Sequence, residues 1–202
     1  MSTVKKEGTA LIIIDMQNMM LDEKGLGAGF GVWKHAKETK TVGNTKKVIE
    51  KARNAGIPVI YIQTLVRPQV LPDVGFWKIF KQIDFTKMSA AEIEFQVGIA
   101  KELAPHPEDF IVTKYNTMDA FHNTDLEQIL KGLKRDTLIF TGVATNLCVE
   151  TTVRSASNRG YNAVVLSDCV ASISEEVQAF PINAIFPMLG EVTTVDKLEI
   201  VS

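Results

Sequence analysis

The sequence has few cysteines and no long hydrophobic run. Cys148 and Cys169 are the two cysteines in 202 residues, and no Cys-x-x-Cys pair occurs. This argues against a disulfide framework and against a dithiol redox motif. The apolar run nearest the start, ALIII at 10–14, is too short for a signal-peptide core or a membrane-spanning helix. We therefore expect a cytoplasmic protein with no membrane partner.

An excess of charge of one sign is missing too. The formal net charge is −2, so no basic surface points to a nucleic-acid partner. The three histidines, His35, His106 and His122, match no zinc or HExxH spacing, so we expect no metal and no cofactor. His35 and His106 are expected to be exposed loop residues. With 46% hydrophobic and 23% charged residues, 1–202 is expected to form a single globular domain.

What the sequence does contain is a regular alternation of strand and helix patterns. Five of the six strand-like runs are nearly continuous in Val, Ile and Leu, which is typical of strands buried on both faces of a parallel sheet. The strands are predicted at 9–15, 57–63, 109–114, 136–142, 162–168 and 191–196, and the helices at 38–55, 124–134, 146–159 and 175–189. Thr124 and Glu127 have the spacing of a capping box. The alternation predicts an α/β fold with a parallel sheet.

Two connections do not follow this alternation. Residues 22–34 are rich in glycine but lack both GxGxxG and GxxxxGK[ST], so an entrance loop is favoured over a phosphate-binding loop. Residues 64–91 hold two prolines and four aromatic residues. So long a connection is expected to be a lid, a binding loop or a subunit contact.

Reactive side chains follow several predicted strands, where ligands bind in open α/β sheets. Asp15, Lys114 and Cys148 could together supply a base, a cation and a nucleophile. With Thr145 as the helix N-cap, Cys148 falls in the first helical turn, where the helix dipole and free N–H groups lower a thiol pKa. Each residue also has an ordinary structural interpretation. Asp15 could cap a turn, Lys114 could be a surface lysine and Cys148 could be a small core residue. Position alone does not decide between nucleophile and core residue for Cys148.

Two further residues near a strand end, Asp168 and Cys169, are expected to have structural roles. Asp168 is predicted to stabilise a turn and Cys169 to be packed in the interior.

Three sequence blocks resemble the isochorismatase-like cysteine hydrolase superfamily over roughly 8–196. They are ALIIIDMQN, DFIVTKYNTMDAFHNTDLEQIL and DTLIFTGVATNLCVETTVRSASNRGYNAVVLSDCVAS. The resemblance implies a three-layer αβα sandwich around a six-stranded parallel sheet, in a homodimer or homotetramer. It also implies an Asp15–Lys114–Cys148 catalytic triad and a cis peptide between Val143 and Ala144. The backbone amides of Ala144 and Cys148 would then form the oxyanion hole.

Departures from related enzymes narrow the implied reaction. Isochorismatase itself lacks the cysteine, and nicotinamidases of the superfamily carry metal-binding histidines where 63–77 has none. The resemblance thus implies a metal-free hydrolase that acts on the ureido or carbamoyl C–N bond of a small amide through a thioester. A vinyl-ether hydrolase and a catalytically silent binding protein are the alternatives. Gln178 stands where many members have histidine.

The expected substrate pocket is formed by Gln17, Arg67, Phe121 and His122. Arg67 could clamp a substrate carboxylate, although a solvated loop arginine is the more common case.

Overall fold

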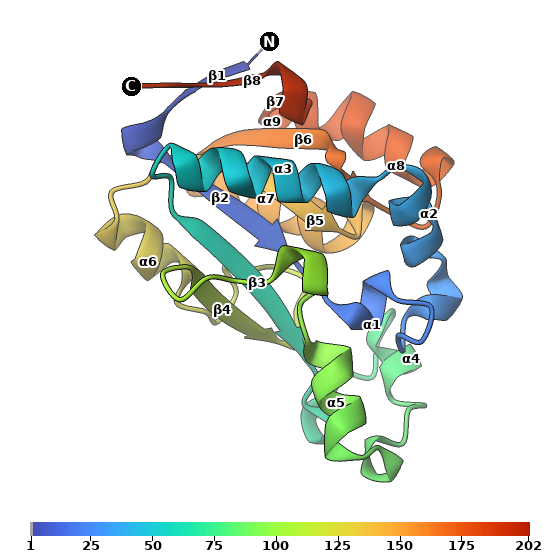
Figure 1. Ribbon diagram of the computed structural model, residues 1–202. Coiled ribbons are helices and arrows are strands. Elements are labelled where there is room, and N and C mark those ends of the chain that lie inside the picture. The colour runs from blue at the N-terminus through green and yellow to red at the C-terminus, as the bar shows by residue number, and fades with distance from the viewer. Residues whose placement is uncertain (1) are drawn as a thin grey trace.

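The computed structural model describes residues 2–202, and its centre is a six-stranded parallel sheet (Figure 1). The strand order is β4-β3-β2-β5-β6-β7. The strands are β2 (Thr9–Ile14), β3 (Val59–Leu65), β4 (Phe110–Tyr115), β5 (Thr137–Val143), β6 (Asn162–Ala171) and β7 (Gly190–Thr193). β2 and β5 are neighbours in the middle of the sheet although they are far apart in the sequence.

Helices cover both faces of this sheet. One face is covered by α2 (Val32–Glu38) and α3 (Thr41–Asn54), and the other by α6 (Leu126–Gly132), α7 (Glu150–Asn158), α8 (Glu175–Phe180) and α9 (Phe186–Leu189). Alternate side chains of β2 point to opposite layers: Leu11 belongs to the buried cluster that includes Val48 of α3, whereas Ile12 belongs to the one that includes Val153 of α7. Both faces of the strand are therefore buried, which explains its continuous apolar sequence. The predicted αβα sandwich is confirmed.

The two ends of the chain form a separate two-stranded parallel sheet that the sequence patterns did not indicate. β1 (Ser2–Lys5) pairs with β8 (Leu198–Val201), so the termini lie side by side (Figure 1). Both strands are four residues long and only alternately buried. Such short strands carry too little periodicity to be distinguished from loop.

Several predicted element boundaries were wrong. The helix expected at 175–189 is divided at Pro181, where a π-helical turn (Pro181–Ile185) separates α8 from α9, because proline lacks the N–H that a regular helix needs. The predicted capping box does not form: Asp125 occupies the N-cap of α6, and the Thr124 hydroxyl donates to the carbonyl of Ala120 instead. The last sheet strand ends at Thr193, before the expected 196.

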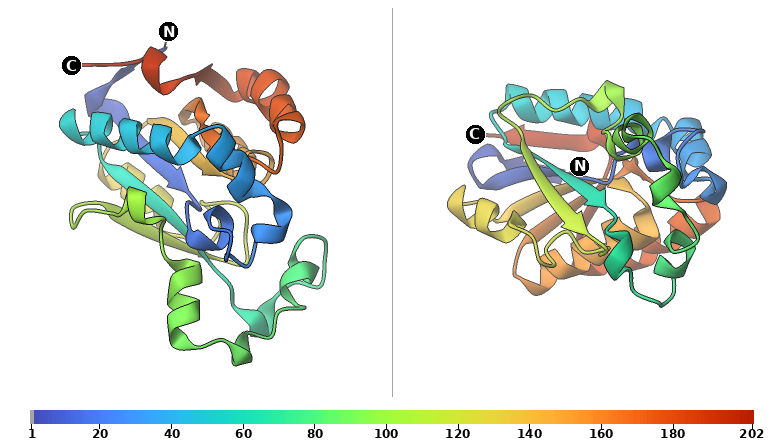
Figure 2. Two further views of the ribbon diagram at one scale, coloured as in Figure 1. Left: turned by 45° about the vertical axis from the view of Figure 1, so that its right-hand side comes forward. Right: turned by 90° about the horizontal axis from the view of Figure 1, so that it is seen from below.

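The long connection 64–91 folds over the end of the sheet where β2 and β3 terminate. It contains the short helix α4 (Trp77–Phe80) and ends in the first turn of α5 (Ala90–Val97), which lies beside α1 (Asn18–Leu21). Figure 2 shows this part of the chain extending beyond the sheet. Among residues 2–202, no helix has the length and apolar character needed to cross a bilayer.

Candidate active site

Asp15, Lys114 and Cys148 meet at the carboxyl end of the sheet. Asp15 follows β2 directly, Lys114 is the penultimate residue of β4, and Cys148 lies in the turn after β5. Lys114 Nζ lies 2.9 Å from Asp15 Oδ2 and 3.4 Å from Cys148 Sγ. It also donates to the carbonyl of Thr117 at 2.9 Å. The lysine therefore holds the carboxylate and the thiol in one hydrogen-bonded group.

The carboxylate is fixed from its other side by a residue that the sequence did not single out. Thr64, near the end of β3, donates its hydroxyl to Asp15 Oδ1 at 2.8 Å. Asp15 itself has a φ of 52°, in the left-handed region that non-glycine residues rarely occupy. This conformation turns the chain sharply at the strand end, and such backbone outliers cluster at functional sites. The sequence alone could not identify Thr64 as the partner of Asp15, because their contact depends on β3 lying next to β2 in the sheet.

Cys148 lies in an irregular turn. The peptide bond between Val143 and Ala144 is cis, and Thr145–Val149 form a π-helical turn that leads into α7. Ala144 holds the N-cap position, so the predicted role of Thr145 as N-cap was wrong. The Thr145 side chain is instead buried and donates to Gln178 Oε1 at 2.9 Å. Gln178 thus ties the nucleophile turn to α8, and π-helical turns of this kind are frequent at functional sites.

The pKa of the Cys148 thiol is raised, contrary to the expectation from its place at a helix start. Burial and the charge of Asp15 raise it to about 12, and the opposing charge of Lys114 only partly offsets them. Burial has the largest single effect on Lys114 and would lower its pKa, but the charges of Asp15 and Cys148 and the hydrogen bonds to them together leave that pKa above its ordinary value. At neutral pH the site therefore holds a neutral thiol beside an ammonium–carboxylate pair.

A narrow cavity of about 40 Å³ opens beside Cys148, enough for one or two water molecules. Its apolar wall consists mainly of Met19, Met20, Phe76, Trp77, Phe80 and Leu147. The three aromatic residues come from α4 and the residue before it, so the 64–91 connection covers the site. Because the space is so small, this cover has to move when a substrate enters.

Of the four predicted pocket residues, Gln17 lines this cavity and the other three lie elsewhere. The guanidinium of Arg67 stacks on the ring of Tyr115, 3.6 Å from its centroid, at an exposed position. Phe121 is buried against Tyr161 on the α7 side of the sheet. His122 is exposed, with Asn123 as its hydrogen-bond neighbour. Phe121 and His122 are close in sequence to the strand that carries Lys114, but their side chains do not reach the site.

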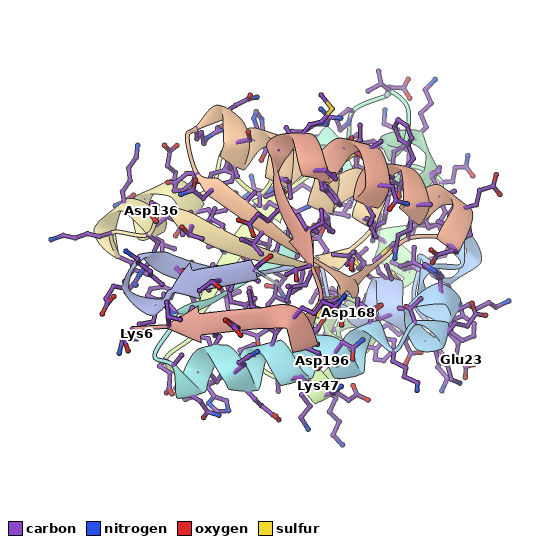
Figure 3. The ribbon with its side chains drawn as sticks, turned by 90° about the horizontal axis from the view of Figure 1, so that it is seen from above. Lys6, Glu23, Lys47, Asp136, Asp168 and Asp196 are labelled. Atoms are coloured by element: carbon purple, nitrogen blue, oxygen red, sulfur yellow. The ribbon has the colours of Figure 1, made fainter. Side chains whose placement is uncertain are left out.

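The other candidates have structural positions. Asp168 accepts hydrogen bonds from the Val195 amide and lies close to Asp196 in Figure 3, and Cys169 is fully buried. His35 is not an exposed loop residue: it is buried in α2 and accepts from the Ser172 amide. His106 is exposed. In the part of the chain that the structure describes, no three His, Cys, Asp or Glu side chains are arranged to hold a metal ion.

Known proteins share both the sequence pattern and the fold. The family model of the isochorismatase domain matches residues 9–197. Ureidoacrylate amidohydrolase RutB of Yersinia enterocolitica is 32% identical, and the alignment covers 92% of this chain and 86% of the relative. RutB of Agrobacterium fabrum is 29% identical over 96% and 90% of the two chains.

Solved structures extend this similarity. A cysteine hydrolase from Pseudomonas syringae pv. phaseolicola superimposes with a TM-score of 0.82 at 29% identity, covering 96% of this chain and 92% of the other. N-carbamoylsarcosine amidase from Thermoplasma acidophilum gives 0.72 at 25% identity, over 95% and 98%. With the family match across nearly its whole length, the chain belongs to the isochorismatase-domain family.

Proposed function

We propose that this protein is a cysteine-dependent amidohydrolase that cleaves a ureido or carbamoyl C–N bond of a small molecule, with Asp15, Lys114 and Cys148 as its catalytic residues. The observation that carries the proposal is the position of Lys114 Nζ, bonded at once to Asp15 and to Cys148 beside a narrow cavity. Nucleophilic attack on an amide requires a thiol, a base and a fixed cation in one hydrogen-bonded group.

In the first half-reaction the Cys148 sulfur attacks the substrate carbonyl carbon while its proton passes to Asp15. The raised thiol pKa means that the proton leaves as the S–C bond forms, so no free thiolate accumulates beforehand. The backbone amides of Ala144 and Cys148, two residues that line the cavity, would donate to the oxyanion. When the C–N bond breaks, the proton on Asp15 goes to the departing nitrogen, and Cys148 is left as a thioester, or as its S-carbamoyl counterpart when the substrate is a urea.

In the second half-reaction water attacks the thioester carbonyl and gives up a proton to Asp15. The S–C bond then breaks, the acid or carbamate leaves, and the proton returns to the Cys148 sulfur. Lys114 is assigned no proton transfer, since Asp15 and Cys148 together hold its pKa above the ordinary value. Its part is to hold the carboxylate and the sulfur in position.

The choice of a ureido or carbamoyl bond is supported by relatives. The RutB proteins are named ureidoacrylate amidohydrolases, and one structural neighbour is named N-carbamoylsarcosine amidase. A vinyl-ether hydrolase would have no use for the thiol that Lys114 contacts here.

The test is a panel of small ureides and amides assayed for ammonia release with the wild-type protein, Cys148→Ala and Cys148→Ser. We expect turnover by the wild type to fall by at least about 10³-fold in both variants, together with a thioester adduct on Cys148 detectable by mass spectrometry. Cys169→Ala, which changes the other, buried cysteine, is the matched control and should retain activity. Unchanged turnover in Cys148→Ala would overturn covalent catalysis by Cys148, and silence across the panel would favour a binding protein.

We also propose that the chain forms a homodimer or homotetramer. The proposal follows the family resemblance, and two exposed apolar side chains, Phe180 of α8 (65%) and Met188 of α9 (83%), are ones that a subunit contact would cover. Light scattering on the purified protein tests this directly, and a monomeric mass would contradict it.

A further inference from the structure

We propose that the substrate carries an uncharged, apolar substituent next to its ureido or amide group, and that the α4 aromatic wall selects for it. The α4 aromatic wall is Phe76, Trp77 and Phe80. This inference rests on the proposed function, because it describes the substrate of the same cysteine site. It is carried by the composition of the cavity and by the hydrogen bonds that already occupy its polar groups.

The cation of the cavity has no bonding capacity left for a substrate anion. A lysine ammonium has three N–H donors. Those of Lys114 are directed to Asp15, to the carbonyl of Thr117 and to the Cys148 sulfur. A substrate carboxylate could bind Lys114 only by breaking one of the contacts on which the proposed chemistry depends.

The neutral polar side chains of the cavity are also engaged. The amide of Gln17 donates to the carbonyls of Thr64 and Val97 and accepts from the Thr64 N–H. The Thr64 hydroxyl donates to Asp15, and the Thr117 hydroxyl accepts from the Asp119 amide and keeps one neutral O–H donor. These groups hold the cavity together, and none of them is a charged donor for an anion.

A carboxylate in this cavity would therefore be buried without a cationic partner and close to the negative charge of Asp15. Burial of an unpaired charge is strongly unfavourable. Two cations nearby in sequence do not line the cavity: the guanidinium of Arg67 stacks on Tyr115, and Lys81 pairs with Asp73 at 3.4 Å.

The apolar surface opposite Cys148 is ordered by contacts among its own residues. Phe76 makes edge-to-face contacts with Trp77 and Phe80, at centroid distances of 5.5 and 5.2 Å. Trp77 and Phe80 are 5.9 Å apart. Together with Met19 and Met20, whose thioethers adapt to irregular shapes, the α4 aromatic wall offers dispersion contacts to an aliphatic or aromatic group.

The first test measures binding without chemistry. Cys148→Ala is titrated by calorimetry with two ureas of matched shape, 4-methylpentylurea and 4-ureidobutanoate, which differ in an isopropyl group replacing a carboxylate. We expect the neutral urea to bind at least about tenfold more tightly. Equal or tighter binding of the acid would overturn the inference, and so would failure of both ligands to bind at millimolar concentration.

The second test moves a charge into the wall. Trp77→Arg should reverse the preference by raising kcat/KM for 4-ureidobutanoate at least about tenfold relative to 4-methylpentylurea. Gln82→Arg places the same charge at an exposed position just after α4, outside the cavity, and should leave the preference unchanged. An equal shift in both variants would show a general charge effect and would contradict selection by the wall.

The two proposals can fail separately. Preferential binding of the acid to Cys148→Ala, with wild-type Cys148 still acylated during turnover, would overturn the substrate class and leave the proposed function standing. Preferential binding of the neutral urea with no acylation of Cys148 by any member of the panel would overturn the proposed function itself.

Discussion

Lys114 and Asp15 form an ion pair that is almost completely closed off from water. Nζ lies 2.9 Å from Oδ2, and the two side chains are 0% and 5% exposed. Removing one partner of such a pair leaves a buried charge uncompensated, which is costlier than removing both. The pair therefore links the stability of the fold to the proposed chemistry.

Lys114→Met is expected to lower the free energy of unfolding by about 3–5 kcal/mol and to abolish turnover. The double variant Asp15→Asn/Lys114→Met removes both charges and should be more stable than Lys114→Met while staying inactive. Urea denaturation together with ammonia-release assays measures both effects. A double variant less stable than the single variant would contradict the ion-pair interpretation.

Thr64→Val removes the hydroxyl that fixes Asp15 Oδ1. A hydrogen bond to a charged group contributes about 1.5–3 kcal/mol, so we expect kcat to fall about 10- to 100-fold with little change in KM. Thr64→Ser keeps the hydroxyl and is the control that should restore most of kcat. A rise in KM at unchanged kcat would instead assign Thr64 to substrate binding.

The raised pKa of Cys148 predicts an unusual pH dependence of alkylation. Because the thiol pKa is about 12, the thiolate fraction should grow about tenfold per pH unit throughout the range below it. Modification by iodoacetamide, followed by mass spectrometry, should therefore accelerate steadily from about pH 7 to about pH 10 without a plateau. Cys169, which is fully buried, should remain unmodified in the folded protein. A plateau near neutral pH would indicate a preformed thiolate.

Gly142→Ala should destabilise the fold and disrupt the site. Gly142 has a φ of 126°, and a Cβ there would lie 2.1 Å from the carbonyl oxygen of Ile14, the residue before Asp15. We expect a loss of at least about 3 kcal/mol in unfolding free energy, from steric overlap and an unfavourable φ.

Gly43→Ala provides the matched control for that variant. Gly43 lies within α3, and a Cβ added there would meet open space, so alanine should be neutral or stabilise by up to about 1 kcal/mol. Denaturation measures both variants. Comparable destabilisation by the two substitutions would contradict a specific requirement for glycine at position 142, where β5 packs closely against β2.

The strand ends were predictable because continuous apolar runs indicate buried parallel strands, and the carboxyl ends of such strands meet at one edge. Asp15, Lys114 and Cys148 follow three such strands in the sequence and meet at that edge in the structure. The hydrogen bond from Thr64 to Asp15 could not be predicted from the sequence, since it depends on β3 lying beside β2 in the sheet order. The pKa of Cys148 was predicted in the wrong direction because a sequence holds no measure of burial or of distance from Asp15.

Phe121, His122 and Arg67 show a different limit. Each was assigned to the pocket from its place near a strand end or in the long connection, yet the direction of a loop side chain depends on its contacts. Phe121 turns toward Tyr161 and Arg67 toward Tyr115. The aromatic residues of 64–91 could be identified in the sequence. That three of them lie over Cys148 is shown only by the residues that line the cavity.

The strand order also has a consequence for how the protein is made. β2 is an early part of the chain, yet one of its two edges pairs with β5, which is synthesised much later. Until then, that edge of a strand that is entirely buried in the folded protein has no partner within the sheet, and unpaired apolar edges promote aggregation. A nascent chain that stalls before residue 137 should therefore depend on chaperones, and recovery of activity during refolding should report the moment at which β5 docks on β2.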